Sequence, residues 1–447
     1  MSGIAGIAKA HQEEKVRKML NRIAHRGPAG QAVKSFKEAT LGVTWKRNQE
    51  HWTLEDLEEG CVADEGGGGR FARSEVREGR LSLKRDPLGA APLYLGEMED
   101  GMLCFASEVK ALLPVTRKIR EFPPGHQQFA EDQPTPYFQL QVLKTTEDSP
   151  EVAAEKLRTL LSAAVERCLN AENTGAWLSG GLDSSTVAAL VRPLVPSLHT
   201  FSVGIEGAPD LEYAKAVAGY IHSEHHELIL KEEDLIRILP EVIGALESFD
   251  ALLVRSSLVN YLVGRLASEH IETVFSGEAG DELFAGYLYL KDLPPSILPL
   301  ELLDITGRLH NTAFQRVDRC ASAHGTLPRL PFADPDVVDY AFRLPIKFKL
   351  RDGVEKWILR RAMAGLLPDN VLNRTKVKFW EGAGVGELLA RHAEDKISDA
   401  DFKREMFLPD GTKLSSKEEL LYYRFFREHF KGLDNLSWMG RTKGGGH

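Results

Sequence analysis

Hydrophobic and polar positions follow two different patterns along the chain. In the first 140 residues, glycines and turn signals separate short strand-like runs such as Arg80 to Leu83 and Met102 to Ala106, which predicts a mostly β region. From Pro150 onward, a helical period runs through Val152 to Leu169. Between these parts, Phe129 to Leu143 is polar and contains Pro and Gln, as is typical of a linker.

The second part of the chain alternates strand-like and helical segments. Its apolar strand-like runs are Ala176 to Leu178, Thr200 to Val203 and Thr273 to Phe275. Such alternation predicts a parallel sheet covered by helices, and ligands of these sheets bind at the carboxyl ends of the strands. We therefore expect the loops after the three runs to face one cleft.

Length and composition narrow the class of protein. A chain of 447 residues is too long for one ordinary core, so we expect two domains, residues 1–140 and 150–447. Hydrophobic residues make up 43% and charged residues 27%, as in an ordinary globular protein. The formal net charge of -9 argues against a nucleic-acid partner, since a nucleic-acid-binding surface needs clustered lysine and arginine.

Cysteine spacing and hydropathy indicate the compartment. The four cysteines lie far apart, without a C-x-x-C pair, which favours a reducing cytoplasm over a disulfide framework. The most apolar stretches are broken by charged residues such as Arg255 and Arg265, so we expect no membrane segment. The oligomeric state stays open, and a homodimer is one option.

The segment after the first apolar run has the chemistry of a phosphate-binding loop. Gly180 and Gly181 let the backbone turn tightly and approach an anion. Ser184 and Ser185 supply hydroxyls at the start of a helix, whose amides and dipole favour a polyphosphate. The carboxylate of Asp183 would repel a bare phosphate, so a cation such as Mg2+ must lie between them. The sequence therefore predicts a magnesium nucleotide.

This loop lacks the lysine of the G-x-x-x-x-G-K-[ST] pattern. It resembles instead the S-G-G-x-D-S signature of the pyrophosphatase-loop enzymes. The resemblance implies that ATP is cleaved between its α and β phosphates, that AMP is attached to a substrate oxygen, and that pyrophosphate is released.

A second loop, Ser276 to Glu282, combines several acids with two glycines directly after a buried strand. If it faces the first loop, Asp183 and Asp281 can share one Mg2+ at the pyrophosphate end of ATP. Glu278 would then act near the acyl group. The residues expected to bind ATP are Leu178, Ser179, Gly180, Gly181, Asp183, Ser184, Ser185, Val203, Ser276 and Gly277.

Further segments carry a resemblance to a known family. Those of the second part are Ser179 to Ser185, Thr200 to Gly204, Pro209 to Leu211, His225 to Glu227, Ser276 to Lys291, Arg329 to Asp334 and Tyr422 to Arg424. Those of the first part are Met1 to Gly6, His25 to Pro28, Arg85 to Gly89, Phe105 to Leu112 and Pro123 to His126. Together they resemble the glutamine-dependent asparagine synthetases over nearly the whole chain. The resemblance implies an α/β fold: a C-terminal pyrophosphatase-loop, Rossmann-like parallel sheet with helices, and a smaller, mostly β N-terminal domain like the Ntn hydrolases.

The first departure from this family concerns the nitrogen source. The family hydrolyses glutamine with an N-terminal cysteine, and this chain has Ser2 there; a hydroxyl is far harder to ionise than a thiol. The family's glutamine-binding H-x-R-L-S segment corresponds to Val43 to Arg47. Its N-G-E stretch has no counterpart between Arg47 and Arg85, where Gly66 to Gly69 stand instead. We therefore expect ammonia or an amine, rather than glutamine, as the nitrogen donor.

The second departure concerns the acid that is activated. The family's T-T-x-R segment, which holds aspartate, corresponds to Leu252, Leu253, Val254 and Arg255. Arg255 can still clamp a carboxylate, but two hydroxyls are replaced by apolar side chains. The substrate is therefore expected to be a small-molecule carboxylate that need not be aspartate.

The resemblance also assigns a catalytic lysine and explains a histidine group. Lys376 matches the family's R-x-K segment and would stabilise charge as the amine displaces AMP. His222, His225 and His226 lack a fourth ligand at a regular spacing, and two of them coincide with the family's H-H-E strand, so zinc is not expected from this trio.

The sequence thus predicts a carbon–nitrogen ligase that adenylates a carboxylate with ATP and Mg2+. Two alternatives remain: a ligase that closes an amide within one substrate, as β-lactam synthetases do, and a catalytically silent partner subunit. β-Lactam synthetases carry a tyrosine in the second loop, whereas this chain keeps Glu278. Enzymes of this loop class that modify tRNA are disfavoured by the net charge.

Overall fold

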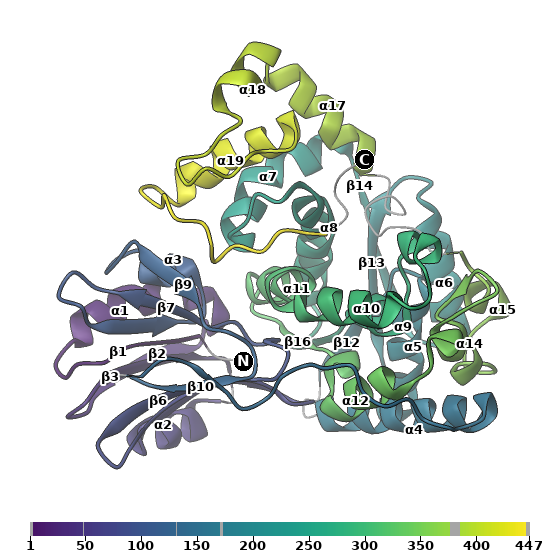
Figure 1. Cartoon of the computed structure of the whole chain (residues 1–447), viewed down its shortest axis with the longest axis horizontal. Coiled ribbons are helices and arrows are strands. Elements are labelled where there is room, and N and C mark those ends of the chain that lie inside the picture. Colours follow the sequence, from purple (N-terminus) through teal and green to yellow (C-terminus); the bar gives the residue numbers. More distant parts are fainter. Residues whose placement is uncertain (1–2, 48, 131, 170–172, 376–384, 444–447) are drawn as a thin grey trace.

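The first part of the chain forms two antiparallel sheets (Figure 1). The computed structural model describes residues 3–47, 49–130, 132–169, 173–375 and 385–443. One sheet has the order β2 (Gly30–Ser35), β3 (Thr40–Trp45), β1 (Ile4–Ile7), β8 (Leu103–Ala106), β7 (Tyr94–Glu97) and β9 (Lys118–Glu121). The other has the order β11 (Thr135–Pro136), β10 (His126–Phe129), β6 (Arg80–Arg85), β5 (Arg70–Arg77) and β4 (Cys61–Gly66). The helices of this part are α1 (Glu13–Asn21), α2 (Glu50–Glu58), α3 (Val109–Leu112) and the 3-10 helix η1 (Ala24–Arg26). Both predicted strands of this part are confirmed, in β6 and β8.

Strand alternation makes these sheets a sandwich with a helix on its outside. Ile4 and Phe105 of the first sheet belong to one buried cluster with Leu83 of the second. Ile7, on the opposite face of β1, belongs to a cluster with Leu20 of α1. Because successive side chains of a strand point to opposite faces, β1 and β8 contribute to both layers of the core. This is the mostly β arrangement that the resemblance implies.

Of the four consecutive glycines, Gly66 ends β4 and Gly67 to Gly69 form the turn of the β4–β5 hairpin. Gly68 and Gly69 have positive φ values of 70° and 80°, which favour glycine. A Cβ on Gly67 would lie 2.3 Å from the carbonyl oxygen of Arg167, near the end of α4 (Pro150–Cys168) in the second part of the chain. The glycines are therefore required because the hairpin tip packs directly against the second part of the chain.

The second part of the chain is built around a five-stranded parallel sheet. Its order is β14 (Glu224–Leu230), β13 (His199–Ile205), β12 (Thr174–Trp177), β15 (Thr273–Phe275) and β16 (Leu327–Arg329). The larger helices are α4 (Pro150–Cys168), α5 (Leu182–Val191), α6 (Pro209–Ile221), α7 (Glu232–Leu246), α8 (Ala251–Ser268), α10 (Leu298–Gly307), α11 (Ala313–Ser322), α12 (Pro335–Arg343), α17 (Gly386–Lys396) and α19 (Lys417–His429). The shorter elements are α9 (Gly280–Phe284), α13 (Ile346–Lys349), α14 (Trp357–Ala362), α15 (Asp369–Leu372), α18 (Asp399–Glu405), η2 (Arg192–Leu194), η3 (Leu288–Asp292), η4 (Leu309–Asn311), η5 (Pro331–Ala333), and the strand pair β17 (Leu350–Arg351) and β18 (Val354–Glu355). The mixed α/β fold is confirmed.

The order of the strands reverses at β12. The chain passes from β12 through α5 to β13 and through α6 to β14, and then returns through α7 and α8 to β15 on the other side of β12. Ala176 of β12 is paired in register with Phe275 of β15. Ligands of such sheets bind where the strand order reverses, because the loops diverge there and leave a crevice. The loops after β12 and β15 are the two that the sequence selects.

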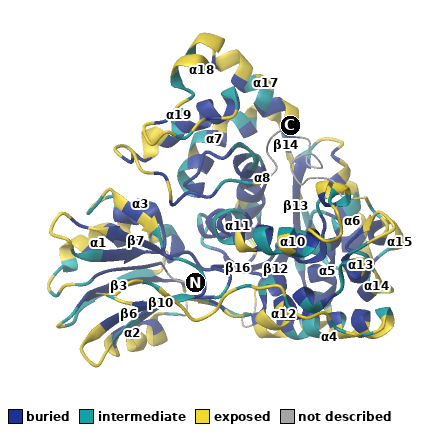
Figure 2. Cartoon of the chain, viewed as in Figure 1, coloured by how far each residue is buried: buried dark blue, intermediate teal, exposed yellow. Residues whose placement is uncertain are grey.

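A buried ion network joins the two parts of the chain. Arg26 of η1 is fully buried, and its guanidinium nitrogens lie 2.7 Å from a carboxylate oxygen of Asp64 in β4. They also lie 2.8 Å from Glu108, which precedes α3, and 2.8 Å from Asp318 of α11. Arg70 of β5 adds a second contact to Asp318, at 2.8 Å. Burial alone would raise the pKa of the Asp318 carboxyl, but the guanidinium groups, Arg26 first, hold it below its usual value. Figure 2 shows buried residues, in dark blue, on both sides of this junction.

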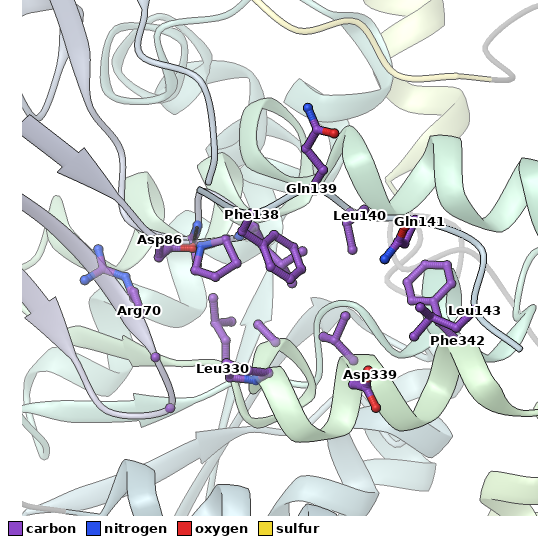
Figure 3. Close-up of a pocket in the computed structure, with 18 residues that line it drawn as sticks. Arg70, Asp86, Phe138, Gln139, Leu140, Gln141, Leu143, Leu330, Asp339 and Phe342 are labelled. Carbon is purple, nitrogen blue, oxygen red and sulfur yellow. Dashed lines mark hydrogen bonds between the residues drawn. The ribbon is translucent and has the colours of Figure 1, made fainter. Parts of the chain in front are cut away.

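The chain segment between the two parts forms one wall of a pocket (Figure 3). Phe138, Leu140 and Leu143 of that segment line the pocket together with Leu330 and Phe342 of the second part. The predicted linker is thus packed between the two parts. The domain limits of residues 1–140 and 150–447 stay a prediction.

Two further findings concern the cysteines and the helices. All four cysteines, each in the described part of the chain, are free thiols. Among the helices that the structure describes, none has the length and apolar character needed to cross a bilayer.

Candidate active site

The two predicted loops are in direct contact at the reversal point of the sheet. In the first loop, Gly180 has a φ of 67°, and a Cβ there would lie 2.4 Å from the Cβ of Tyr213 in α6. In the second loop, a Cβ on Gly280 would lie 2.5 Å from the carboxylate carbon of Asp183, and one on Gly277 would lie 2.6 Å from the amide nitrogen of Ser184. The glycines are therefore needed because each loop presses against its neighbour.

Hydroxyls and amides of the first loop are arranged around one small pocket. The Ser179 and Ser184 hydroxyl oxygens lie 3.0 Å apart, and the Gly181 amide donates to Ser179 Oγ at 3.3 Å. Gly181 is also the residue that precedes helix α5. The pocket is lined by Ser179, Gly181, Leu182, Asp183, Ser184, Asp210, Glu355, Lys356, Arg360, Arg374 and Thr375.

Four of the ten expected ATP residues, Ser179, Gly181, Asp183 and Ser184, line this pocket. The other six do not line it: Leu178, Gly180, Ser185, Val203, Ser276 and Gly277. Ser185 is fully buried, and Val203 and Ser276 are 5% and 4% exposed. Their contact with a nucleotide stays a prediction.

The two predicted metal-binding acids converge on one cationic atom. Lys356 Nζ lies 2.5 Å from Asp183 Oδ2 and 2.6 Å from Asp281 Oδ1. Lys356 is 2% exposed and has a φ of 55°, a strained value for a lysine. The carboxylates thus come close enough to share one cation, and carboxylate oxygens are the donors that Mg2+ prefers. The residues fit the predicted magnesium ion.

Further cationic side chains complete the pocket. Arg374 stacks on Tyr213, with 4.0 Å from its guanidinium carbon to the ring centre, and forms an ion pair with Asp210. Arg360 pairs with Glu355 at 2.6 Å. Lysine and arginine groups of this kind stabilise the charge of a triphosphate. Lys356 and Arg360 were missed by the sequence reasoning, because the segment around Lys356 has the charged, turn-rich character of a surface loop.

The second loop brings more acids to the edge of the site. Glu278, the predicted catalytic residue, forms an ion pair with Arg316 of α11 at 2.7 Å. Glu282, which sequence reasoning did not select, is buried and accepts a hydrogen bond of 2.5 Å from the Tyr287 hydroxyl. Burial, reinforced by the negative charge of Asp281, raises the pKa of Glu282 to about 7. Glu282 can therefore exchange a proton near neutral pH.

The predicted substrate residues lie in the first turns of α8. Arg255 Nε donates to Glu418 Oε1 of α19 at 2.8 Å, and Tyr422 donates to the same oxygen at 2.8 Å. Leu252 is partly exposed, whereas Leu253 is 2% exposed and packs in the main core. As placed, Leu253 is a core residue, and Arg255 already holds a carboxylate of the chain itself.

Lys376 lies outside the residues that the structure describes. Its predicted role as the lysine near the acyl carbon therefore stays a prediction. Arg374, two residues earlier, reaches the first loop, since its Nη1 donates to the Ser179 carbonyl oxygen at 3.4 Å.

A phosphate-binding loop beside paired acids, at the reversal point of a parallel sheet, defines a pyrophosphatase-loop protein with an added antiparallel sandwich. Family models agree: asparagine synthase matches residues 156–303 and 300–442, and the glutamine amidotransferase domain matches residues 57–159. The chain belongs to the asparagine synthase family, whose members are ATP-dependent carbon–nitrogen ligases.

Individual relatives show the extent of the likeness. A probable glutamine-hydrolyzing asparagine synthetase of Dictyostelium discoideum is 32% identical over 405 residues, which cover 80% of this chain and 71% of that protein. Asparagine synthetase B of Escherichia coli (strain K12), also glutamine-hydrolyzing, is 33% identical over 386 residues, covering 80% and 69%. Among solved structures, NMN synthetase from Francisella tularensis has a TM-score of 0.30 and 14% identity, covering 65% of this chain and 98% of that one, a likeness too low to support a conclusion.

Proposed function

We propose that this protein amidates a carboxylic acid through an acyl-adenylate, forming AMP and pyrophosphate and taking its nitrogen from ammonia or an amine. The observation that carries this proposal is the meeting of Asp183 and Asp281 on one cationic atom beside the phosphate-binding loop. That geometry suits a magnesium ion on the pyrophosphate end of ATP. When bound, the ion would neutralise phosphate charge, and Asp183 and Asp281 would hold it.

The remaining side chains suit the other parts of the reaction. Ser179, Ser184 and the Gly181 amide offer donors to phosphate oxygens, and Arg360 and Arg374 offer positive charge. Glu278 belongs to the second loop, and we propose that the acyl group lies near it. Lys376 is proposed to stabilise charge as the amine displaces AMP.

Several observations support ammonia or an amine over glutamine. The glutamine amidotransferase match begins at residue 57, so it leaves out both Ser2 and Val43 to Arg47. In that segment Trp45 is buried, and a Cβ on Gly30 would lie 2.4 Å from its ring, while Arg47 is exposed. The segment thus serves packing between β2 and β3, and its arginine faces solvent.

The nitrogen source has a direct test at Ser2. We expect glutamine to yield no glutamate above background, because a serine hydroxyl without its supporting groups is a weak nucleophile. Ser2→Ala should leave ammonia-dependent pyrophosphate release unchanged, with both products measured by coupled assay. Glutamate release that disappears in Ser2→Ala would show instead that the first part is a working glutaminase.

Lys356 gives a test of the cation site that needs no substrate acid. In Lys356→Met the two carboxylates lose their shared cation, so we expect the melting temperature without Mg2+ to fall by at least about 2 °C. MgCl2 should stabilise this variant more than the wild type, because the competing ammonium is gone. The exposed Lys347→Met is the control. Equal Mg2+-induced shifts in Lys356→Met and wild type would contradict the shared site.

One assay also separates the alternatives. Pyrophosphate release from ATP should be screened across carboxylic acids, with and without ammonia. Release that requires both an acid and added amine supports the proposal. Release with a single amino acid substrate and no added amine supports intramolecular closure, and no release with any acid supports a silent subunit.

A cytoplasmic location, suited to the free cysteines, and a homodimer are further parts of the proposal.

A further inference from the structure

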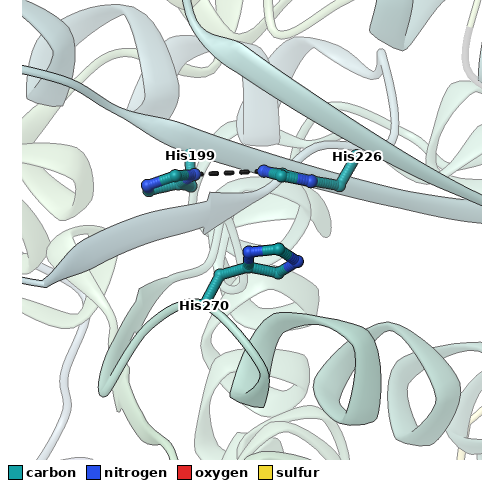
Figure 4. A group of neighbouring side chains, drawn as sticks. All are labelled: His199, His226 and His270. Atoms are coloured by element: carbon teal, nitrogen blue, oxygen red, sulfur yellow. Dashed lines mark hydrogen bonds between the residues drawn. The ribbon is translucent and has the colours of Figure 1, made fainter.

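Three histidines from distant parts of the chain meet at one point (Figure 4). His199 opens β13, His226 is the third residue of β14, and His270 follows the end of α8. One nitrogen from each ring lies within 4.8 Å of the other two. His199 Nδ1 and His226 Nε2 are 3.0 Å apart, and the His226 and His270 ring centres are 4.1 Å apart.

A carboxylate lies beside two of these histidines. Glu224, which pairs in register with His199, places Oε2 at 3.6 Å from His199 Nδ1 and Oε1 at 3.6 Å from His226 Nε2. In a tetrahedral zinc site, with bonds of about 2.0 to 2.1 Å, neighbouring donor atoms lie about 3.3 Å apart. The separations of 3.0, 3.6 and 3.6 Å lie on both sides of this value. The donor atoms of His199, His226 and Glu224 are thus spaced about as in a tetrahedral site.

The surroundings of the histidines suit a ligand role. The ring of buried Phe201 stacks on His226 at 5.0 Å with 16° between the planes, and so fixes the orientation of that ring. His270 is exposed, which leaves the point open to solvent.

This group differs from the trio that the sequence draws attention to. His225 points to the other face of β14, where its ring nitrogens lie 3.0 Å from Thr200 Oγ1 and 3.1 Å from Ser202 Oγ. His222 ends α6 in a left-handed conformation. Only His226 belongs to both groups, and the two partners that matter, His199 and His270, stand 27 and 44 residues away in the sequence.

We propose that His199, His226 and His270, with Glu224 as the fourth donor, bind a divalent transition-metal ion, with Zn2+ favoured by this three-nitrogen, one-oxygen set. The site lies at the amino ends of β13 and β14, whereas the ATP loops follow carboxyl ends of strands. The ion would tie β13, β14 and the end of α8 together. Its role is structural and independent of the proposed ligase chemistry.

The test uses the full-length, tag-free protein, stripped with EDTA and titrated with ZnCl2 or CoCl2. We expect one equivalent of Zn2+ to bind, a rise in melting temperature, and visible absorption of a tetrahedral Co2+ centre. His270→Asn should weaken Zn2+ binding at least tenfold; because His270 is exposed, this variant should fold. His199→Gln is the second variant, and His222→Asn, whose side chain tolerates the left-handed backbone, is the matched control.

Each outcome decides the proposal. Loss of the Co2+ absorption and of the Zn2+-induced thermal shift in both His270→Asn and His199→Gln, with both kept in His222→Asn, supports it. Less than a stoichiometric amount of Zn2+ in the wild type overturns it, as does wild-type affinity in the two cluster variants. Because the readouts are binding and absorption, they are separate from any test of the ligase activity.

Discussion

Asp183→Asn and Asp281→Asn are each expected to lower Mg2+-dependent pyrophosphate release by about 100-fold or more. Each change would remove one anionic ligand oxygen from the Mg2+ ion that Asp183 and Asp281 would hold, and that ion would neutralise phosphate charge of ATP. The two carboxylates meet Lys356 Nζ at 2.5 and 2.6 Å, so either one alone presents only half of the site. The loss should be greatest at limiting Mg2+, because the weakened site then stays mostly empty.

The fold should survive both substitutions. Asparagine has nearly the shape of aspartate, and Lys356 keeps the other carboxylate as a partner. Melting temperatures measured in parallel should therefore stay close to that of the wild type. Asp292→Asn, at an exposed position of the neighbouring η3 helix, is the matched control. Near-normal turnover of either active-site variant at limiting Mg2+ would end the shared-metal hypothesis.

The sheet of the second part was predictable because its central strands are buried on both faces. Such strands appear as short continuous apolar runs with glycine-rich loops after them. The run Thr273 to Phe275 has the same bounds as β15, and the runs at Ala176 and Thr200 fall on β12 and β13. The helical period from Val152 to Leu169 falls on α4, which begins at Pro150 with Ser149 as its cap.

The edge strands were not predictable in the same way. The first four residues of β14 are all charged or ionisable, and six of its seven residues are partly or fully exposed. β16 contains a proline, which is tolerated there because β16 lies at the edge of the sheet. Both strands gain their order from pairing with a neighbour, and that information is not local to their sequence.

The candidate site likewise contains residues that the local sequence indicated and residues that it did not indicate. Its loops, glycines and acids are contiguous in sequence, so local chemistry sufficed to select them. Lys356 stands 173 residues from Asp183, and Arg316 stands 38 residues from Glu278. Partners brought together only by tertiary structure leave no spacing pattern. For the same reason, the sequence did not indicate the buried network around Arg26 or the close approach of the three histidines.

Leu252 and Leu253 are expected to disfavour aspartate relative to a less polar acid. A charged substrate group placed against a leucine loses water contacts without regaining hydrogen bonds, and an unpaired buried polar group costs about 1 to 3 kcal/mol. Exchange of both leucines for threonine should therefore raise kcat/KM for aspartate about tenfold or more, since each 1.4 kcal/mol is a factor of about ten.

The structure predicts different effects for the two single substitutions. Leu252 is partly exposed, so Leu252→Thr alone should give most of the gain. Leu253 packs in the core, so Leu253→Thr should mainly lower stability, which a thermal melt would detect. Arg255 is held by Glu418, and a substrate carboxylate has to share or replace that contact. If the wild type already makes asparagine from aspartate and ammonia as efficiently as it uses any other acid, these leucines do not set specificity, and an ordinary asparagine synthetase pocket should be sought elsewhere around Arg255.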